Sequence, residues 1–427
     1  MNARARKVAI IGGGIMGSAA AYYLRRLGIE AVVLERGAFG TEQSSRALGF
    51  IRCQGRHHAE IGLAVHANRM WPGLAGELQA DLEYVREGNL VVAETAADED
   101  RLRRSSAAAR AAGLSTRVVS RAEIAHISPR LAGPWRSGIF TAEDGHASPV
   151  KATHAFAAAA QRLGAEFRPD TPARAIEIAD GRVAGVRTAS GLVAADAVLC
   201  AAGVSTNFLL RPLGLALPIQ IVRSSNLESE PVPPFTRIGV WSPHIAMRPR
   251  LDGTFSFGTG YRGLRPDHDL GAVSLNHLGW FLPRFLANPR RPRLRLNRDT
   301  LDNLGRALAA RAAMRPMPEP IVNEDMIAER LRWAGALFPH VGGFRRARAW
   351  AGRIDATPDL IPIIGPFEKL KGLFVAGGFC AHGLALAPIV GRTLAELMAR
   401  GTSEIDLRAF RPERFRGPVL DEDPTAL

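Results

Sequence analysis

The stretch Lys7-Val8-Ala9-Ile10-Ile11-Gly12-Gly13-Gly14-Ile15-Met16-Gly17 decides the fold of this chain. Its apolar half predicts a short buried strand, and the small and apolar residues that recur at helical spacing up to Gly28 predict a helix after the glycines. A second apolar run, residues 31–34, predicts a strand that ends in Glu35. A strand, a G-x-G-x-x-G turn, a helix, a second strand and an acid, in this order, are typical of dinucleotide binding.

Each part of this unit has a physical task in holding a dinucleotide. Gly12 permits the tight turn, Gly14 lets the backbone approach a pyrophosphate, and Gly17 allows the helix to pack closely. The helix N-terminus supplies partial positive charge for the phosphates. Glu35 can accept hydrogen bonds from both ribose hydroxyls, and its charge would repel a 2′-phosphate, which disfavours NADP. The motif alone does not separate FAD from NAD.

Length and composition narrow the class of protein. The 427 residues suggest two or three domains or one large discontinuous fold, and 47% apolar with 22% charged residues exclude a disordered, collagen-like or coiled-coil protein. The formal net charge is +14, and only four of the 55 basic residues are lysines. A basic chain can bind nucleic acid, an anionic membrane surface or an acidic substrate, but arginines dispersed along the whole chain favour compositional bias.

The cysteines indicate an intracellular protein, and the apolar segments indicate a protein without a membrane span. Cys53, Cys200 and Cys380 lie far apart without C-x-x-C spacing, so we expect no disulfide framework and no metal site, and we predict reduced thiols in a cytoplasmic protein. Residues 372–391 contain no charged residue, but their glycines and Pro388 favour a strand, a turn and a helix start. We therefore expect no transmembrane segment.

Three further segments carry a family resemblance. They read Ser44-Ser45-Arg46-Ala47-Leu48-Gly49-Phe50-Ile51-Arg52, then Trp350-Ala351-Gly352-Arg353-Ile354-Asp355-Ala356-Thr357-Pro358-Asp359, then Gly377-Gly378-Phe379-Cys380-Ala381-His382-Gly383-Leu384-Ala385-Leu386-Ala387-Pro388-Ile389-Val390-Gly391. With the first motif, they resemble the D-amino-acid oxidase superfamily of FAD oxidoreductases, which includes glycine oxidase, sarcosine oxidases, and the β subunits of proline and opine dehydrogenases. The resemblance covers the chain from about residue 7 to 400.

The resemblance implies an α/β fold with two domains. A Rossmann-like FAD-binding domain would be assembled from residues 1–85, 145–215 and 335–427. An α+β substrate domain with a mixed or antiparallel sheet would comprise residues 86–144 and 216–334. Residues 271–320 look longer than the usual connection of the family, so we expect an extra helical insert there. We favour a helical cap that fills the substrate domain, and the open alternatives are docking on a partner subunit, docking on a membrane surface, and a lid over the flavin cavity.

The resemblance also implies which residues contact FAD. Monomeric sarcosine oxidase attaches its FAD through a cysteine where this chain has Gly352, so we predict that FAD is bound noncovalently. The expected cofactor-binding residues are Gly12, Gly14, Ile15, Met16, Gly17, Glu35, Arg36, Ser44, Ser45, Arg46, Leu48, Ala173, Gly203, Gly352, Gly378, Phe379, His382, Gly383 and Leu384.

The expected chemistry is oxidation of a C–N bond by hydride transfer to the flavin, followed by hydrolysis of the imine. The flavin performs the redox step, so no side chain is assigned as a catalytic base. A helix predicted over residues 383–400 would direct the positive end of its dipole at the flavin. The remaining requirement is to hold a substrate carboxylate, which suits a guanidinium group. The candidates for substrate binding are Arg52, Arg353, Arg248, Tyr261 and His244, in that order for the arginines.

Several alternatives stay open at this point. The oxygen-activating lysine of monomeric sarcosine oxidase has no counterpart, because no lysine lies between Lys151 and Lys369, so the electron acceptor is O2 or another molecule. The substrate class is a D-amino acid, an N-substituted glycine, an opine or an imino acid. A relative that oxidises a carboxymethylaminomethyl base in tRNA would suit the positive charge, although no basic patch with interleaved aromatic residues supports nucleic acid as a partner. A noncatalytic flavoprotein subunit or assembly factor is the third possibility.

Overall fold

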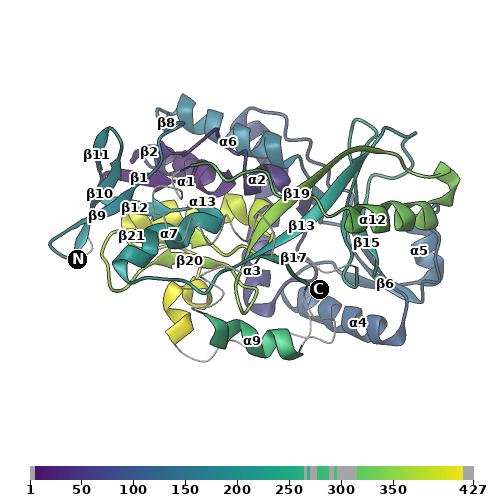
Figure 1. Cartoon of the computed structure of the whole chain (residues 1–427). Coiled ribbons are helices and arrows are strands. Elements are labelled where there is room, and N and C mark those ends of the chain that lie inside the picture. Colours follow the sequence, from purple (N-terminus) through teal and green to yellow (C-terminus); the bar gives the residue numbers. More distant parts are fainter. Residues whose placement is uncertain (1–4, 264–266, 270–276, 288–292, 296–314, 417–427) are drawn as a thin grey trace.

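The computed structural model describes residues 5–263, 267–269, 277–287, 293–295 and 315–416. Two large sheets lie next to each other, the one with the glycine motif at the left and the other at the right of Figure 1. The predicted α/β fold class is confirmed. Among the described residues, no helix combines the length and the apolar character needed to cross a bilayer.

The six-stranded sheet has the order β20-β21-β12-β1-β2-β8, in which only β20 is antiparallel to its neighbour. Along β1, Val8 and Ile10 face one apolar core, whereas Ala9 and Ile11 face another. Because both faces are buried, this strand is a continuous apolar run. The strands are β1 (Lys7–Ile11), β2 (Glu30–Leu34), β8 (Glu166–Arg168), β12 (Ala197–Cys200), β20 (Ile363–Pro366) and β21 (Leu373–Gly377).

Helices cover one face of this sheet. They are α1 (Ile15–Arg26), α3 (His58–Leu78), α6 (Pro149–Arg162) and α13 (Gly383–Arg400). Gly391 lets α13 pack directly on α1, since a Cβ there would lie 2.8 Å from Ala19. The helix predicted over residues 383–400 is confirmed, and it ends at Gly401 with φ +80°.

A small antiparallel sheet covers the opposite face. Its apolar residues share a core with Ala9 and Ile11 of β1. It contains β9 (Ala175–Ala179), β10 (Arg182–Thr188) and β11 (Gly191–Ala194), and it is followed by α7 (Thr206–Leu210). Three short elements lie in the chain where it passes from strands of one large sheet to strands of the other. They are the helix α2 (Gln43–Arg46) and the paired strands β3 (Phe50–Ile51) and β7 (Gly145–His146).

The second large sheet is mixed, as predicted. Its order is β18-β17-β13-β16-β15-β14-β4-β6-β5, with β19 paired along β13. The pairs β14–β4 and β17–β18 are parallel and the others are antiparallel. The strands are β4 (Asn89–Ala93), β5 (Arg117–Ser120), β6 (Ser137–Thr141), β13 (Gln220–Ser229), β14 (Gly239–Trp241), β15 (Ile245–Pro249), β16 (Phe255–Thr259), β17 (Asp267–Asp269), β18 (Arg293–Arg295) and β19 (Arg346–Ala356).

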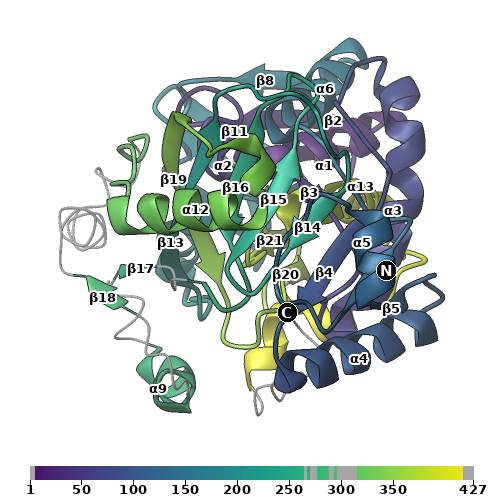
Figure 2. The ribbon, with the colours of Figure 1, turned by 90° about the vertical axis from the view of Figure 1, so that its right-hand side faces the viewer.

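One helix, α12 (Glu324–Leu337), lies across this sheet, as Figure 2 shows. Its buried side chains share a core with Phe255, Phe257 and Phe338. Two further helices, α4 (Ala96–Ala111) and α5 (Arg121–Ile127), pack on this sheet, whereas α9 (Leu278–Ala287) contacts Phe415 through Trp280. Short 3-10 turns occur at Gly203–Ser205, Arg211–Leu213, Pro339–Val341, Arg408–Phe410 and Pro412–Arg416.

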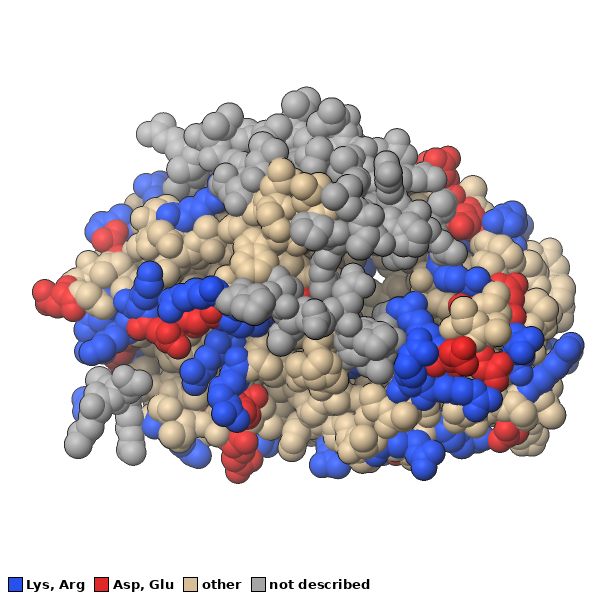
Figure 3. Space-filling model, turned by 90° about the horizontal axis from the view of Figure 1, so that it is seen from below, with Lys and Arg blue, Asp and Glu red and all other residues tan. Residues whose placement is uncertain are grey.

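The predicted division into two domains remains a prediction, and the pairing of one strand bears on one of its boundaries. The eleven-residue β19 falls in the predicted FAD-binding segment 335–427, yet it pairs with β13 of the mixed sheet. The proposed insert 271–320 lies mostly outside the described residues. On the face seen in Figure 3, basic side chains occur toward both ends with acidic ones among them, which agrees with dispersed charge.

Candidate active site

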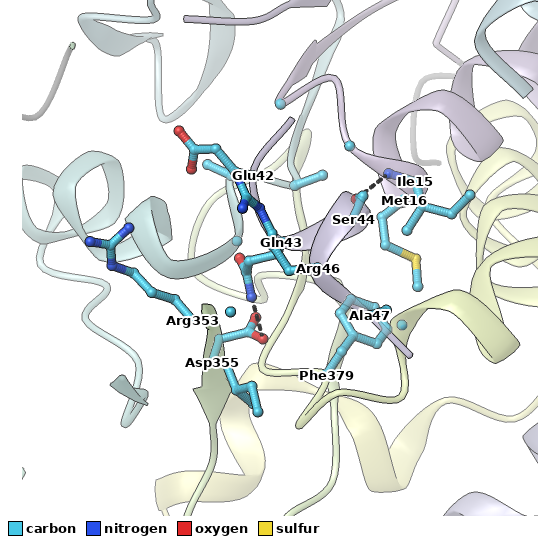
Figure 4. A pocket seen from close by; sticks show the side chains of 18 of the residues that line it. Ile15, Met16, Glu42, Gln43, Ser44, Arg46, Ala47, Arg353, Asp355 and Phe379 are labelled. Atoms are coloured by element: carbon cyan, nitrogen blue, oxygen red, sulfur yellow. Dashed lines mark hydrogen bonds between the residues drawn. The ribbon is translucent and has the colours of Figure 1, made fainter. Parts of the chain in front are cut away.

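A cavity of about 820 Å³ lies where the carboxyl ends of β1 and β2 meet α2, β19 and the start of α13. Figure 4 shows that segments far apart in the sequence contribute side chains to it. Its position, outside the carboxyl ends of parallel strands, is where α/β folds bind ligands. Its volume lies toward the upper end of the range for small-molecule and cofactor sites.

The glycine turn at one side of the cavity fits a dinucleotide. Gly12 has φ +109°, and a Cβ there would lie 2.4 Å from the carbonyl oxygen of Ala201, so the turn requires glycine. The N–H of Ile15, in the first turn of α1, donates to Ser44 Oγ at 2.9 Å (Figure 4). The dipole at this helix start favours an anion such as a phosphate.

Glu35 ends β2 at the cavity wall. Its carboxylate accepts hydrogen bonds from the N–H of Gly13 at 2.8 Å and of Gly37 at 3.1 Å. Burial raises the pKa of this carboxyl, and the two N–H donors oppose that shift. Each oxygen has a second lone pair, so the group retains the capacity to accept a ribose hydroxyl.

A buried aspartate joins three segments of the cavity wall. Asp355, near the end of β19, accepts the N–H of Gly378 at 2.7 Å and the side-chain amide of Gln43 at 3.0 Å. The oxygen of Gln43 in turn accepts the N–H of Val204 at 2.9 Å. A Cβ on Gly203 would lie 1.9 Å from this oxygen. The network therefore holds α2, β19 and the turn before α13 in one arrangement.

His382, the residue just before α13, is held from behind by a buried carboxylate. Its Nδ1 lies 3.0 Å from the carboxylate of Glu60, which is fully buried and also lies 3.4 Å from Arg56 Nη1. Burial lowers the pKa of His382, and Arg56 adds to this. Burial would raise the pKa of Glu60, but His382 and Arg56 outweigh it. A neutral His382 that donates from Nδ1 to Glu60 presents Nε2 as an acceptor.

Two predicted substrate arginines line the cavity. Arg52 is 5% exposed, its guanidinium lies 4.1 Å from the ring centroid of Trp241, and its Nη1 donates to the carbonyl of Gln54 at 2.9 Å. Burial lowers the pKa of Arg52 to about 9, so it stays charged at neutral pH. Arg353 on β19 donates to the carbonyl of Pro318 at 2.9 Å.

The cavity also brings together most of the predicted cofactor-binding residues. Those that line it are Gly12, Gly14, Ile15, Met16, Glu35, Arg36, Ser44, Arg46, Leu48, Ala173, Gly203, Gly352, Phe379, His382, Gly383 and Leu384. Gly17, Ser45 and Gly378 do not. A Cβ on Gly17 would lie 2.0 Å from the carbonyl oxygen of Gly12, so this glycine acts on the turn through packing.

Three predicted substrate residues lie outside the cavity lining, each for a visible reason. Arg248 is buried and donates to the carbonyl of Leu48 at 3.1 Å. The hydroxyl of Tyr261 donates to the carbonyl of Val92 at 2.7 Å, between strands. The ring of His244 stacks on Trp333 with centroids 3.5 Å apart.

Arg248 also defines the protonation state of a buried histidine. It donates to Nδ1 of His146 at 3.4 Å, and Nε2 of His146 lies 3.0 Å from the carbonyl of Arg237. The ring is therefore a donor on one side and an acceptor on the other, which describes neutral imidazole. Burial, together with the charge of Arg248, lowers the pKa of His146 to about 4.

This shift predicts a pH dependence of stability. Unfolded His146 binds a proton near pH 6.5, whereas the folded form does so only near 4, so its stabilising contribution is present above 6.5 and lost as the pH falls through 4. When the pH falls from 7.5 to 5, the free energy of unfolding should decrease by about 2 kcal/mol more in the wild type than in His146→Gln. Urea unfolding at both pH values measures this. The exposed His126→Gln serves as control, and parallel pH curves for wild type and His146→Gln would contradict the assignment.

Sequence reasoning missed Arg56, Glu60, Gln43 and Thr259. The spacing of Arg56 and Glu60, four residues apart where a helix begins, was the one local signal available. The pairing of Glu60 with His382 spans 322 positions and leaves no local pattern.

The fold and the site define a class, a protein with a Rossmann-like dinucleotide site. Consistent with this, the family model described as "FAD dependent oxidoreductase" (DAO) matches residues 7–397. The chain therefore belongs to the FAD dependent oxidoreductase family and is an oxidoreductase with FAD as cofactor.

The relatives have amino-acid-like substrates in their names. Glycine oxidase from Bacillus subtilis is 26% identical over 416 residues, covering 95% of this chain and 96% of that protein. The β subunit of sarcosine oxidase from Rhizobium meliloti is 25% identical, covering 97% and 90%. The chain spans only 46% of 4-methylaminobutanoate oxidase from Paenarthrobacter nicotinovorans, at 26% identity over 96% of this chain. Among solved structures, L-amino acid deaminase from Proteus myxofaciens superposes with a TM-score of 0.88 at 22% identity, covering 97% and 94%, which shows a shared fold.

Proposed function

We propose that this enzyme oxidises the C–N bond of a small amine or amino acid that carries a carboxylate. The observation that carries the proposal is the buried, charged Arg52, which faces the same cavity as the glycine turn and the start of α13. The carboxylates of Asp144 and Glu60 act on this charge from within the protein, and a substrate carboxylate would match the planar set of donors that Arg52 brings to the cavity. The names of the relatives point to the same substrate class.

The side chains around the cavity bind and orient, and FAD, when bound, supplies the acceptor for the hydride. Arg52, with Arg353 as the second candidate, would hold the carboxylate and so place the C–H bond. The positive end of the α13 dipole lies at the cavity and would favour negative charge on a flavin bound there. Nε2 of His382, turned away from Glu60, can accept a hydrogen bond from a group in the cavity.

We further propose that FAD is bound noncovalently. Cys380 lines the cavity, but its Sγ donates to the carbonyl of Gly378 at 3.3 Å. Burial raises the pKa of this thiol to about 12, so it is protonated and a poor nucleophile. Cys53 and Cys200 are buried elsewhere, and all three free thiols suit the cytoplasmic location that we propose.

A second feature of the cavity supports a proposal about the electron acceptor. None of the four lysines of the chain, all of which lie in described segments, belongs to its lining. This supports slow use of O2 and a dehydrogenase that passes electrons to another acceptor. A partner subunit, as the sarcosine oxidase relative has by its name, would be one route for those electrons.

An anaerobic reduction panel tests the function. FAD-loaded enzyme is mixed with sarcosine, D-amino acids, N-carboxymethyl amino acids, opines and cyclic imino acids, and the flavin absorption is followed. We expect at least one carboxylate-bearing amine to bleach the flavin, and the corresponding decarboxylated amine to fail. Subsequent exposure to air distinguishes rapid from slow reoxidation. If no amine in the panel reduces the flavin, the proposed function is wrong.

A further inference from the structure

Arg330 on α12 is a buried cation behind the cavity wall. It is 1% exposed, and its Nε has no hydrogen-bond partner among the residues that the structure describes. No carboxylate in the described segments forms an ion pair with it, and Glu329 acts on its charge only at longer range. Its Nη1 donates to the carbonyl of Met326 at 2.8 Å, and its Nη2 donates to Thr259 Oγ1 at 2.5 Å. Burial lowers the pKa of Arg330 to about 10, which leaves it charged at neutral pH. A buried charge without a counterion is costly, so its retention requires an explanation.

The hydroxyl that Arg330 contacts belongs to the cavity. Thr259, at the end of β16, and Ser224, on β13, both line it, and their hydroxyl oxygens lie 3.3 Å apart. A guanidinium can only donate, so Thr259 Oγ1 accepts from Arg330 and must direct its own proton elsewhere. The proton goes either into the cavity or to Ser224, whose proton then goes onward. In both cases the pair offers a hydrogen-bond donor to whatever occupies the cavity.

We propose that Arg330 is a specificity-determining residue that fixes the Thr259–Ser224 pair as a donor, so that this wall selects an anionic acceptor group of the substrate. The inference rests on the proposed function, because it assigns a role toward the same carboxylate-bearing substrate. The positive charge of Arg330 behind the wall also favours an anion in the cavity. Neutralising Arg330 would let the Thr259 hydroxyl turn its proton away from Ser224 and the cavity, which weakens the preference for anions.

Equilibrium binding to the FAD-loaded enzyme tests this without turnover. Acetate and its uncharged counterpart acetamide are titrated, and binding is followed by the flavin absorption spectrum or by calorimetry. In Arg330→Met we expect the dissociation constant of acetate to rise roughly tenfold and that of acetamide to change less than about twofold. Arg330→Lys should recover part of the preference, and Thr259→Ser should retain it.

If Arg330→Met folds poorly, Thr259→Val tests the same proposal. It should also weaken acetate more than acetamide, and in the Arg330→Met background it should add little, because both changes break one chain of hydrogen bonds. Arg332→Met, an exposed arginine on the same helix, is the matched control and should leave both ligands unaffected.

The outcomes separate the two claims. Equal weakening of acetate and acetamide, additive effects of the two substitutions, or a loss of FAD affinity with unchanged acetate binding would each overturn the role of Arg330. If acetate discrimination follows Arg330 but no amine reduces the flavin, the proposed oxidation is wrong while the anion-selecting wall stands. If amines reduce the flavin and discrimination does not depend on Arg330, only this inference is wrong.

Discussion

Arg52→Met is expected to lower kcat/KM for carboxylate-bearing amines by roughly 10²–10³-fold, while FAD affinity stays within about a factor of three. Truncating one partner of a buried, hydrogen-bonded charge pair costs about 2–5 kcal/mol. The side chain faces the cavity near Trp241, away from the glycine turn that would hold the phosphates, so the loss should fall on the substrate. Arg52→Lys keeps the charge but not the planar fork, and should lie between wild type and Arg52→Met.

The measurement combines anaerobic flavin reduction with titration of apoprotein by FAD. Arg69→Met, an exposed arginine on α3, is the control and should behave as wild type. The thermal midpoint of each variant shows whether the fold is retained. Unchanged kinetics in Arg52→Met, with the fold intact, would remove Arg52 from the substrate site.

Gly17→Ala is expected to destabilise the nucleotide-binding sheet and to abolish tight FAD binding. Its Cβ would lie 2.0 Å from the carbonyl oxygen of Gly12, and that backbone belongs to the turn that faces the phosphates. Overpacking of this kind costs about 3 kcal/mol. If the same strain falls on the turn, FAD affinity drops by roughly 100-fold.

Chemical unfolding and FAD titration measure the two effects. Gly62→Ala provides the control, because Gly62 lies inside α3 with nothing within 4 Å of the added Cβ. That change should stabilise the helix by up to about 1 kcal/mol. Equal FAD affinity in Gly17→Ala and Gly62→Ala would show that the turn tolerates a shift.

The parts of the fold that could be predicted from the sequence are those that depend on local patterns of residues. The strand before Gly12, the helix after it and the helix that ends at Gly401 follow from apolar periodicity and from glycines with left-handed or crowded backbone. These signals act within a few residues of each other, so they are visible without any knowledge of tertiary contacts.

The rest depends on which distant segments meet. Arg52 and Arg248 are both buried arginines, and nothing in their local sequence states that one faces the cavity while the other pairs with His146. Likewise, β19 follows α12 in the chain, and only its pairing with β13 shows to which sheet it belongs. Side-chain direction is decided by strand register, which a single sequence does not reveal.

The strand order of the six-stranded sheet has a consequence for the time at which the protein becomes functional. β1 emerges first from the ribosome, but its sheet is completed only by β21, residues 373–377, which pairs with β12. At about 5–20 residues per second, roughly 20–80 s of synthesis separate the glycine turn from the segment that closes the cavity. Over this interval the nascent chain displays half of a nucleotide site, and FAD can be enclosed only after β21 has been made.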